Sequence, residues 1–190
     1  FVLLRSDTAE KKTLLGRHKY WQILPLGYSG VRPFGVKARN VGQQFLQEAL
    51  LLPAKEAPLV IVQGPAGTAK TFYALAAGLE KVLEENREEY RKLLICRPNA
   101  QFDQEIGFLP GSEQEKISPL LRPIADNLEI LLDQEGSRGR RGEEELRGRI
   151  DYLFESGIIT AEAMNFMRGR SITDTWLMID EAQNLTPRQV

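Results

Sequence analysis

The residues best suited to chemistry form a glycine-rich stretch that ends in a lysine and a threonine. Backbone N–H groups of small residues at a helix N-terminus can surround a phosphate. The lysine of such a loop reaches the β- and γ-phosphates of a nucleotide, and the next hydroxyl binds Mg²⁺. The pattern therefore predicts a phosphate loop made of Gly64, Pro65, Ala66, Gly67, Thr68, Ala69, Lys70 and Thr71.

One position of this loop departs from the usual pattern, which places glycine directly before the lysine. Ala69 stands there instead. Glycine permits a positive φ, and a Cβ in that conformation costs on the order of 1 kcal/mol. Because alanine is the smallest replacement, we interpret the motif as weakened and not lost. The alternative is an ordinary glycine-rich turn between a strand and a helix.

A second group of polar residues follows the apolar run at 175–179. An aspartate at such a strand end holds Mg²⁺, and a glutamate directly after it can activate the attacking water. Asp180 and Glu181 fit these two roles. Gln183 lies two residues further on, and we expect it either to sense the γ-phosphate or to be a solvated or capping amide.

The elements that must position these residues follow from hydrophobic patterning. Continuous apolar runs at 59–63, 92–96 and 175–179 are typical of buried parallel strands, and a shorter run at 158–160 indicates an edge strand. A helical pattern runs from Thr71 to about Tyr90. A shorter helix precedes it, with Asn40 as N-cap. The sequence predicts an α/β fold with a parallel sheet flanked by helices.

Two further side chains have candidate roles on position alone. Gln43 lies upstream of the loop and could hydrogen-bond an adenine ring, with Gln44 as the reserve; the alternative is a solvated helix glutamine. Arg97 follows the strand at 92–96 at its carboxyl edge, where ligands of α/β sheets bind. It is interpreted either as a contact to nucleic-acid phosphate or as a surface salt bridge.

The 190 residues are enough for one domain with its own core, and the net charge is −1. Residues 1–41 carry eight Lys or Arg against Asp7 and Glu10, a net +6, so the remainder carries −7. This basic segment indicates either a polyanionic or acidic partner or a solvated arm. Cys96 is the single cysteine, which excludes an intrachain disulfide, and no apolar run has membrane-spanning length.

Later in the chain, prolines at 119 and 123 are expected to break a helix over 113–132 near its start. Residues 133–149 are charged and glycine-rich, and we expect a flexible surface insertion there. Arg168 and Arg170 flank a glycine. They are interpreted either as surface arginines or as a finger that acts on phosphate in a neighbouring subunit.

Together these motifs resemble the PhoH-like (phosphate-starvation-inducible) ATPases over residues 40 to 190. The resemblance rests on the loop at 64–71, Arg97-Pro98, Gly107-Phe108-Leu109-Pro110-Gly111, residues 167–171 and Asp180-Glu181-Ala182-Gln183. It implies a P-loop NTPase fold similar to the RecA-like core of superfamily I helicases. It also implies a cytoplasmic ATPase that uses ATP and Mg²⁺ and acts on RNA or single-stranded DNA.

Residue by residue, the resemblance implies that Lys70 contacts phosphate, that Thr71 and Asp180 bind Mg²⁺, and that Glu181 activates water. Gln43 is similar to an adenine-contacting glutamine of helicases. Arg168 and Arg170 match an arginine pair of the family, whose role stays open. A ring-shaped homo-oligomer, with one of them acting across the interface, is a secondary hypothesis.

The expected organisation is a basic segment at 1–39, packed on or extending from the core, and an ATPase domain at 40–190. The family places a further strand and polar sensor residues after the acidic pair, and the sequence stops at Val190. We therefore expect either an incomplete sheet, with the fold truncated at its C-terminus, or a natural protein that continues past Val190.

Two rival functions remain open. A nucleotide-binding module with negligible hydrolysis would follow if Ala69 and the absent sensor residues disable turnover. A small-molecule kinase agrees less well with the sequence. No motif indicates a pocket for a phosphate-accepting metabolite, and Glu181 is better placed to activate water.

Overall fold

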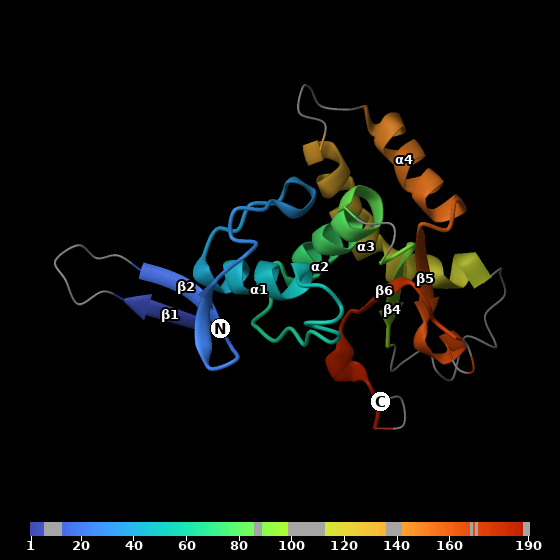
Figure 1. Cartoon of the computed structure of the whole chain (residues 1–190). Coiled ribbons are helices and arrows are strands. Elements are labelled where there is room, and N and C mark those ends of the chain that lie inside the picture. The colour runs from blue at the N-terminus through green and yellow to red at the C-terminus, as the bar shows by residue number, and fades with distance from the viewer. Residues whose placement is uncertain are drawn as a thin grey trace.

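Figure 1 shows the computed structural model, in which helices lie between a small antiparallel sheet and a parallel sheet. The structure describes residues 1–5, 13–85, 89–98, 113–135, 142–167, 169 and 171–187. The motif at Gly107 to Gly111 lies outside these residues.

The parallel sheet has the strand order β5-β4-β6. β4 (Lys92–Arg97) lies between β5 (Ile159–Ala163) and β6 (Thr175–Ile179). Ile95 pairs with Ala161 on one side and with Met178 on the other. The apolar side chains of β4 are buried because the strand is central, and Leu93 has no exposed surface. The α/β class and the strands predicted at 92–96, 158–160 and 175–179 are confirmed.

The segment that leads into the phosphate loop is not a strand, so the prediction of a buried parallel strand at 59–63 is wrong. Leu59 and Ile61 are 76% and 84% exposed. A strand needs a neighbour that satisfies its backbone groups. Among the described residues the sheet ends at β6, whose Leu177 is 41% exposed. In the described sheet, residues 59–63 therefore have no strand to pair with beside β6.

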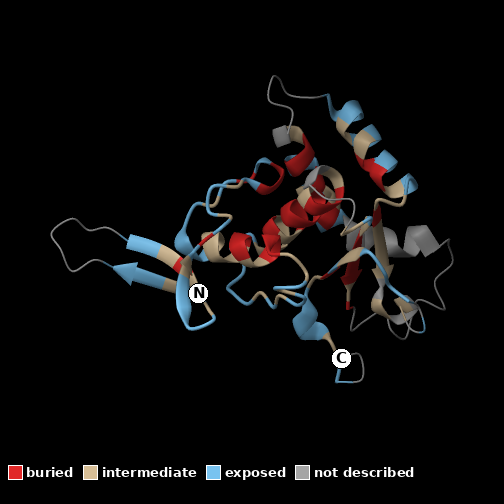
Figure 2. Ribbon diagram, in the orientation of Figure 1, coloured by how far each residue is buried: buried red, intermediate tan, exposed pale blue. Residues whose placement is uncertain are grey.

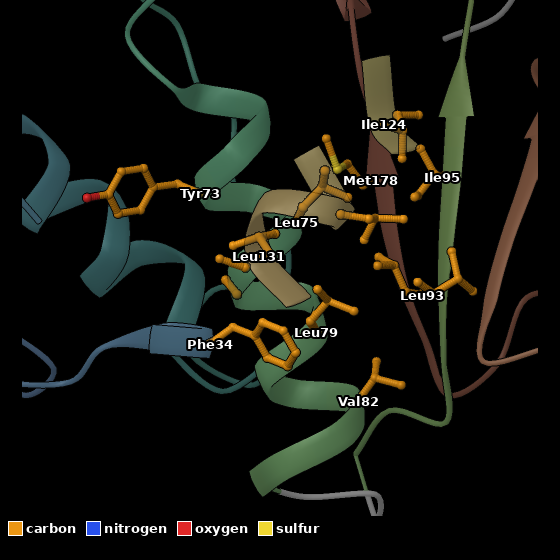
Figure 3. Close-up of a cluster of buried hydrophobic side chains, with 14 of the residues drawn as sticks. Phe34, Tyr73, Leu75, Leu79, Val82, Leu93, Ile95, Ile124, Leu131 and Met178 are labelled. Atoms are coloured by element: carbon orange, nitrogen blue, oxygen red, sulfur yellow. The ribbon is translucent and has the colours of Figure 1, made fainter. Parts of the chain in front are cut away.

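Helices supply most of the core. α1 (Val41–Leu51) begins at Asn40, whose side chain accepts a hydrogen bond from the Gln43 N–H at 2.9 Å, as predicted for an N-cap. α2 (Lys70–Leu79) continues into a π-helical turn, η2 (Glu80–Glu85), and does not reach Tyr90. Figures 2 and 3 show the buried faces of α2 and α3 (Glu113–Glu135) meeting the sheet. The residues that meet include Leu75, Leu79, Ile95, Leu128 and Leu131.

Two helical predictions need correction. α3 runs through Pro119 and Pro123 without the expected break. Each proline removes one helical hydrogen bond, but the buried face that includes Ile124 and Leu132 holds the helix against the core. Of the expected insertion at 133–149, residues 133–135 end α3 and residues 143–149 begin α4 (Glu143–Glu155). Among the described helices, none combines the length and apolar character needed to cross a bilayer.

The approach of α2 to β6 depends on a glycine. A Cβ on Gly78 would lie 2.9 Å from Cδ1 and Nε1 of Trp176 and 3.0 Å from Cδ1 of Leu93. The Trp176 ring also meets Tyr90 edge-on, with ring centroids 5.4 Å apart. The indole therefore fills the space that a side chain at Gly78 would need, and this contact sets how closely the helix lies on the strand.

The N-terminal residues form an antiparallel sheet of β1 (Val2–Arg5), β2 (Thr13–Lys19) and β3 (Gln22–Pro25). The chain that follows is fastened to α1 by Glu48, which is fully buried. Its carboxylate accepts hydrogen bonds from the N–H groups of Gly27 at 3.0 Å and Tyr28 at 2.7 Å. Arg17 Nε lies 3.5 Å from the same carboxylate. Arg17, Gly27 and Tyr28 of the basic segment thus contact α1 through Glu48.

Substitution of Gly78 in α2 and of Gly148 in α4 should change stability in opposite directions. Alanine at either position gains helix propensity, about 1 kcal/mol. Gly148→Ala in α4 meets nothing within 4 Å and should stabilise the protein by about that amount. Gly78→Ala displaces Trp176 and should lower the free energy of unfolding of the protein by about 1–3 kcal/mol. Urea unfolding measures both, and a stabilised Gly78→Ala variant would contradict the packing described for α2.

Candidate active site

The phosphate loop ends where α2 begins, and two of its residues have left-handed backbone conformations. Gly67 has φ 76°, and Ala69 has φ 63° and ψ 28°. The Ala69 carbonyl accepts the helical hydrogen bond of the Tyr73 N–H at 3.0 Å. Alanine thus takes the conformation for which glycine is the usual residue, at a cost on the order of 1 kcal/mol. The substitution retains the left-handed turn directly before α2.

The Lys70 ammonium group lies against its own loop. Its Nζ donates hydrogen bonds to the carbonyl oxygens of Gly64 at 2.8 Å and Pro65 at 2.7 Å. Thr68 Oγ1 donates to the Pro65 carbonyl at 2.8 Å. The first turn of α2 contains no acidic residue, so its N-terminal dipole is not neutralised there. The loop therefore presents a cation and a positive helix end to the same space.

Thr71 and Asp180, which are 109 positions apart in the chain, are in direct contact. Thr71 Oγ1 donates a hydrogen bond to Asp180 Oδ1 at 2.9 Å. Asp180 follows β6, and its backbone N–H donates to the Cys96 carbonyl of β4 at 2.9 Å. The side chain of Asp180 is 11% exposed. The fold thereby brings the hydroxyl and the carboxylate that were predicted to share a magnesium ion to one place.

Arg97, at the end of β4, joins both carboxylates of the acidic pair. Its Nε donates to Asp180 Oδ2 at 3.1 Å, and its Nη2 lies 3.7 Å from Glu181 Oε1. Of the two interpretations of Arg97, the ion pair is the one that the structure contains. Its place at the carboxyl edge of β4 was readable from the sequence, but its partners were not, because they follow a different strand.

Glu181 leaves the strand in a left-handed conformation, with φ 55° and ψ 38°, at the start of η4 (Ala182–Asn184). This backbone turn carries its side chain away from β6, and the carboxylate is 46% exposed. Gln183 Nε2 donates a hydrogen bond to Glu181 Oε2. Gln183 therefore lies beside the predicted water-activating carboxylate.

Gln43 is tied to α2 instead of standing free in solvent. Its Oε1 accepts hydrogen bonds from the Arg39 N–H at 2.8 Å and from the Tyr73 hydroxyl at 3.2 Å. The Tyr73 hydroxyl also reaches the Lys37 carbonyl at 3.0 Å, and burial raises the pKa of this tyrosine. Tyr73 lies in the first turn of α2, so Gln43 stands close to the loop.

The structure therefore brings together the loop, Asp180, Glu181 and Gln183, and it places Arg97 beside the two carboxylates. Gln43 is attached to the same helix start through Tyr73. Arg168 and Arg170 lie outside the described residues, and their interpretation as a finger stays a prediction.

Comparison with known proteins shows which family contains these motifs. Residues 35–190 match the family described as PhoH-like protein. Protein PhoH2 of Bacillus subtilis is 40% identical over 193 residues, which cover 100% of this chain and 40% of that protein. A PhoH-like protein of Synechocystis is 36% identical over 127 residues, covering 67% of this chain and 34% of the relative.

A PhoH-like protein of Mycobacterium leprae is 31% identical over 155 residues, covering 81% of this chain and 40% of the relative. The chain thus spans less than half the length of each of these three relatives. Because the family match covers most of the chain and contains every motif of the site, this protein belongs to the PhoH-like family.

Proposed function

We propose that this domain binds ATP with Mg²⁺ between the phosphate loop and the acidic pair and hydrolyses it. The observation that carries the proposal is the hydrogen bond of 2.9 Å between Thr71 and Asp180. It joins the two halves of a nucleotide site that lie far apart in the chain. A structural turn with no ligand would have no need to bring a hydroxyl and a carboxylate together at a helix N-terminus.

The loop fits a triphosphate in charge and in the size of its residues. Its small residues leave backbone groups accessible, and a Cβ at Gly67 would meet nothing within 4 Å. Lys70 donates to two loop carbonyls, which a phosphate oxygen can replace as the acceptor. Binding would exchange two neutral acceptors for charged ones, so the ammonium group gains stronger hydrogen bonds.

The oxygen donors of Thr71 and Asp180 fit Mg²⁺, which prefers hard ligands and retains water and phosphate oxygens. The described residues contain no cluster of three or more His, Cys, Asp or Glu that could hold a metal alone. Thr71 and Asp180 would therefore hold the ion jointly with the nucleotide. When bound, Mg²⁺ supplies neutralisation of the charge that develops on the phosphates.

Glu181 is proposed to orient and deprotonate the attacking water. Its 46% exposure lets water reach the carboxylate, and Gln183 holds one of its oxygens. Gln43 is proposed to contact the adenine ring, positioned by its bond to Tyr73. These roles rest on the placement of the side chains around α2 and β6 and on the family pattern.

The finer functional proposal extends beyond hydrolysis. We infer from the family resemblance that ATP turnover is coupled to remodelling of RNA or single-stranded DNA in the cytoplasm. A homo-oligomeric ring in which Arg168 or Arg170 acts on a neighbouring site is part of the same proposal. The rival is a nucleotide-binding module without turnover. The left-handed conformation of Ala69 supports turnover over that rival, because the loop keeps the turn that glycine usually makes.

Three single variants test the ATPase assignment by steady-state phosphate release and by binding of a fluorescent ATP analogue. Lys70→Ala should weaken nucleotide binding and turnover together. Glu181→Gln should retain binding and lower turnover by about 10²–10⁴-fold, the usual contribution of a general base. Lys55→Ala, an exposed lysine upstream of the loop, is the matched control and should change neither. Turnover in Glu181→Gln equal to wild type would refute the role given to Glu181.

Arg97 generates a separate prediction about the metal. Its guanidinium neutralises the carboxylates near which Mg²⁺ is proposed to bind, so the cation and the ion repel each other. Arg97→Gln should lower the Mg²⁺ concentration at half-saturation about fivefold, which corresponds to about 1 kcal/mol. A Mg²⁺ titration of ATP-analogue binding measures this midpoint.

The control for Arg97 is Arg91→Gln at the opposite end of the same strand. Arg91 pairs with Asp174 in an exposed position, with Nε 3.8 Å from the carboxylate. Its loss should leave the Mg²⁺ midpoint unchanged. An unchanged midpoint in Arg97→Gln would show that the guanidinium does not compete with the ion.

A further inference from the structure

The turn between β2 and β3 displays two aromatic side chains to solvent. Lys19 pairs with Gln22, so Tyr20 and Trp21 are the only residues of the turn. Their φ angles are 50° and 63°, as a type I′ hairpin requires. Tyr20 is 81% exposed and Trp21 is 95% exposed. The two rings therefore project beyond the hairpin without packing on the core.

The choice of residues at this turn is unfavourable for stability. Type I′ turns favour Asn-Gly, because bulky residues rarely adopt positive φ. Such strain costs of order 1–3 kcal/mol per residue and is concentrated at functional sites. Burial does not offset it here, because both rings are almost fully exposed. A reason other than folding is needed for two aromatic residues in this turn.

Basic and polar residues directly precede the aromatic pair along the hairpin, in the order Arg17, His18, Lys19, Tyr20 and Trp21. Lys19 Nζ lies 5.2 Å from the centroid of the Tyr20 ring. His18 meets Trp21 edge-on with ring centroids 6.3 Å apart. Within residues 1–5 and 13–47 the described part of the chain contains no acidic residue, and its cations are Arg5, Arg17, Lys19, Arg32, Lys37 and Arg39.

We propose that the hairpin tip, residues 17–22, binds single-stranded nucleic acid. Bases stack on Tyr20 and Trp21, and backbone phosphates contact Lys19 and His18. Exposed aromatic rings beside cations are how proteins hold single strands, because every base has a π-face and every linkage a negative charge. The inference deepens the proposed function and rests on it, since it names the surface that would hold the nucleic acid on which ATP turnover acts.

The hairpin is also connected to the chain that leads into the phosphate loop. Lys19 Nζ lies 2.8 Å from Glu56 Oε2, and Arg17 donates to the same oxygen at 2.7 Å. These two hydrogen bonds hold the pKa of Glu56 below its usual value. A bound phosphate competes with Glu56 for Lys19, so occupation of the tip alters a contact eight residues before Gly64.

A protein partner is the alternative occupant, because Leu14 and Ile23 are 48% and 42% exposed. Both lie on the sheet face that carries His18, since His18 pairs with Ile23 and Leu14 is four residues earlier on β2. The two exposed rings beside the Lys19 ammonium group favour a single-stranded polyanion over an apolar protein surface, because such a surface would not need the cation.

The test measures fluorescence anisotropy of labelled oligouridylate and oligothymidylate with the protein, in the absence of nucleotide. The double variant Tyr20→Asn/Trp21→Gly removes both rings and installs the residues that the turn prefers, so it should fold at least as stably as wild type. Its affinity should fall tenfold or more, about the effect of losing one stacked base.

Two single variants complete the design. Tyr152→Ala removes a tyrosine that is 64% exposed on α4, remote from the tip in Figure 1, and should retain wild-type affinity. Lys19→Ala should weaken binding to both oligomers and reduce the slope of log affinity against log salt by about one.

A tighter complex with oligouridylate assigns the site to RNA, and a tighter complex with oligothymidylate assigns it to DNA; either supports the inference.

Wild-type affinity in the double variant, or no binding of either oligomer by wild type, would overturn the inference. A double variant that binds both oligomers normally but no longer self-associates in sedimentation would also overturn the inference, and it would assign the tip to a protein contact. Phosphate release without nucleic acid should be the same in the double variant and wild type. Nucleic-acid binding without ATP hydrolysis would refute the ATPase proposal and support the hairpin site. ATP hydrolysis without nucleic-acid binding would support the ATPase proposal and refute the hairpin site.

Discussion

The hydrogen bond between Thr71 and Asp180 is the constraint on which the candidate site depends. Thr71 is placed by α2 and Asp180 by β6, so the bond exists only while helix and strand keep their distance. Gly78 and Trp176 set that distance, and β4 holds the Asp180 backbone through the Cys96 carbonyl. The chemistry of the site is therefore a consequence of how closely one helix approaches an edge strand.

Local signals were sufficient to predict several elements of this arrangement. The apolar runs at 92–96 and 175–179 indicate strands because a continuous run has no solvated face. Asn40 predicts the start of α1 because its side chain can accept a hydrogen bond from the first turn. The loop and the acidic pair were found by their spacing, and the fold brings Thr71 and Asp180 within hydrogen-bond distance.

Features that depend on a distant partner could not be predicted in this way. Residues 59–63 have the composition of a buried strand, but whether they form one depends on a neighbouring strand that their own sequence does not encode. The two carboxylates beside Arg97 come from the end of another strand, and the prolines of α3 are tolerated because its far face is buried. The roles assigned to Arg168 and Arg170 stay predictions.

The exposure of Leu59 and Ile61 has a thermodynamic consequence for the loop. With Leu59 and Ile61 in solvent, the loop is anchored by α2 on one side, and on the other side Val60 is partly buried against the core. A ligand that grips its backbone must then order this lead-in chain, and that costs about 1–2 kcal/mol of backbone entropy for each residue fixed. A partner or a further segment that covered the outer edge of β6 and ordered residues 59–63 would bear this entropy cost before the ligand binds. The affinity of the loop for phosphate would then rise although the partner does not touch the ligand.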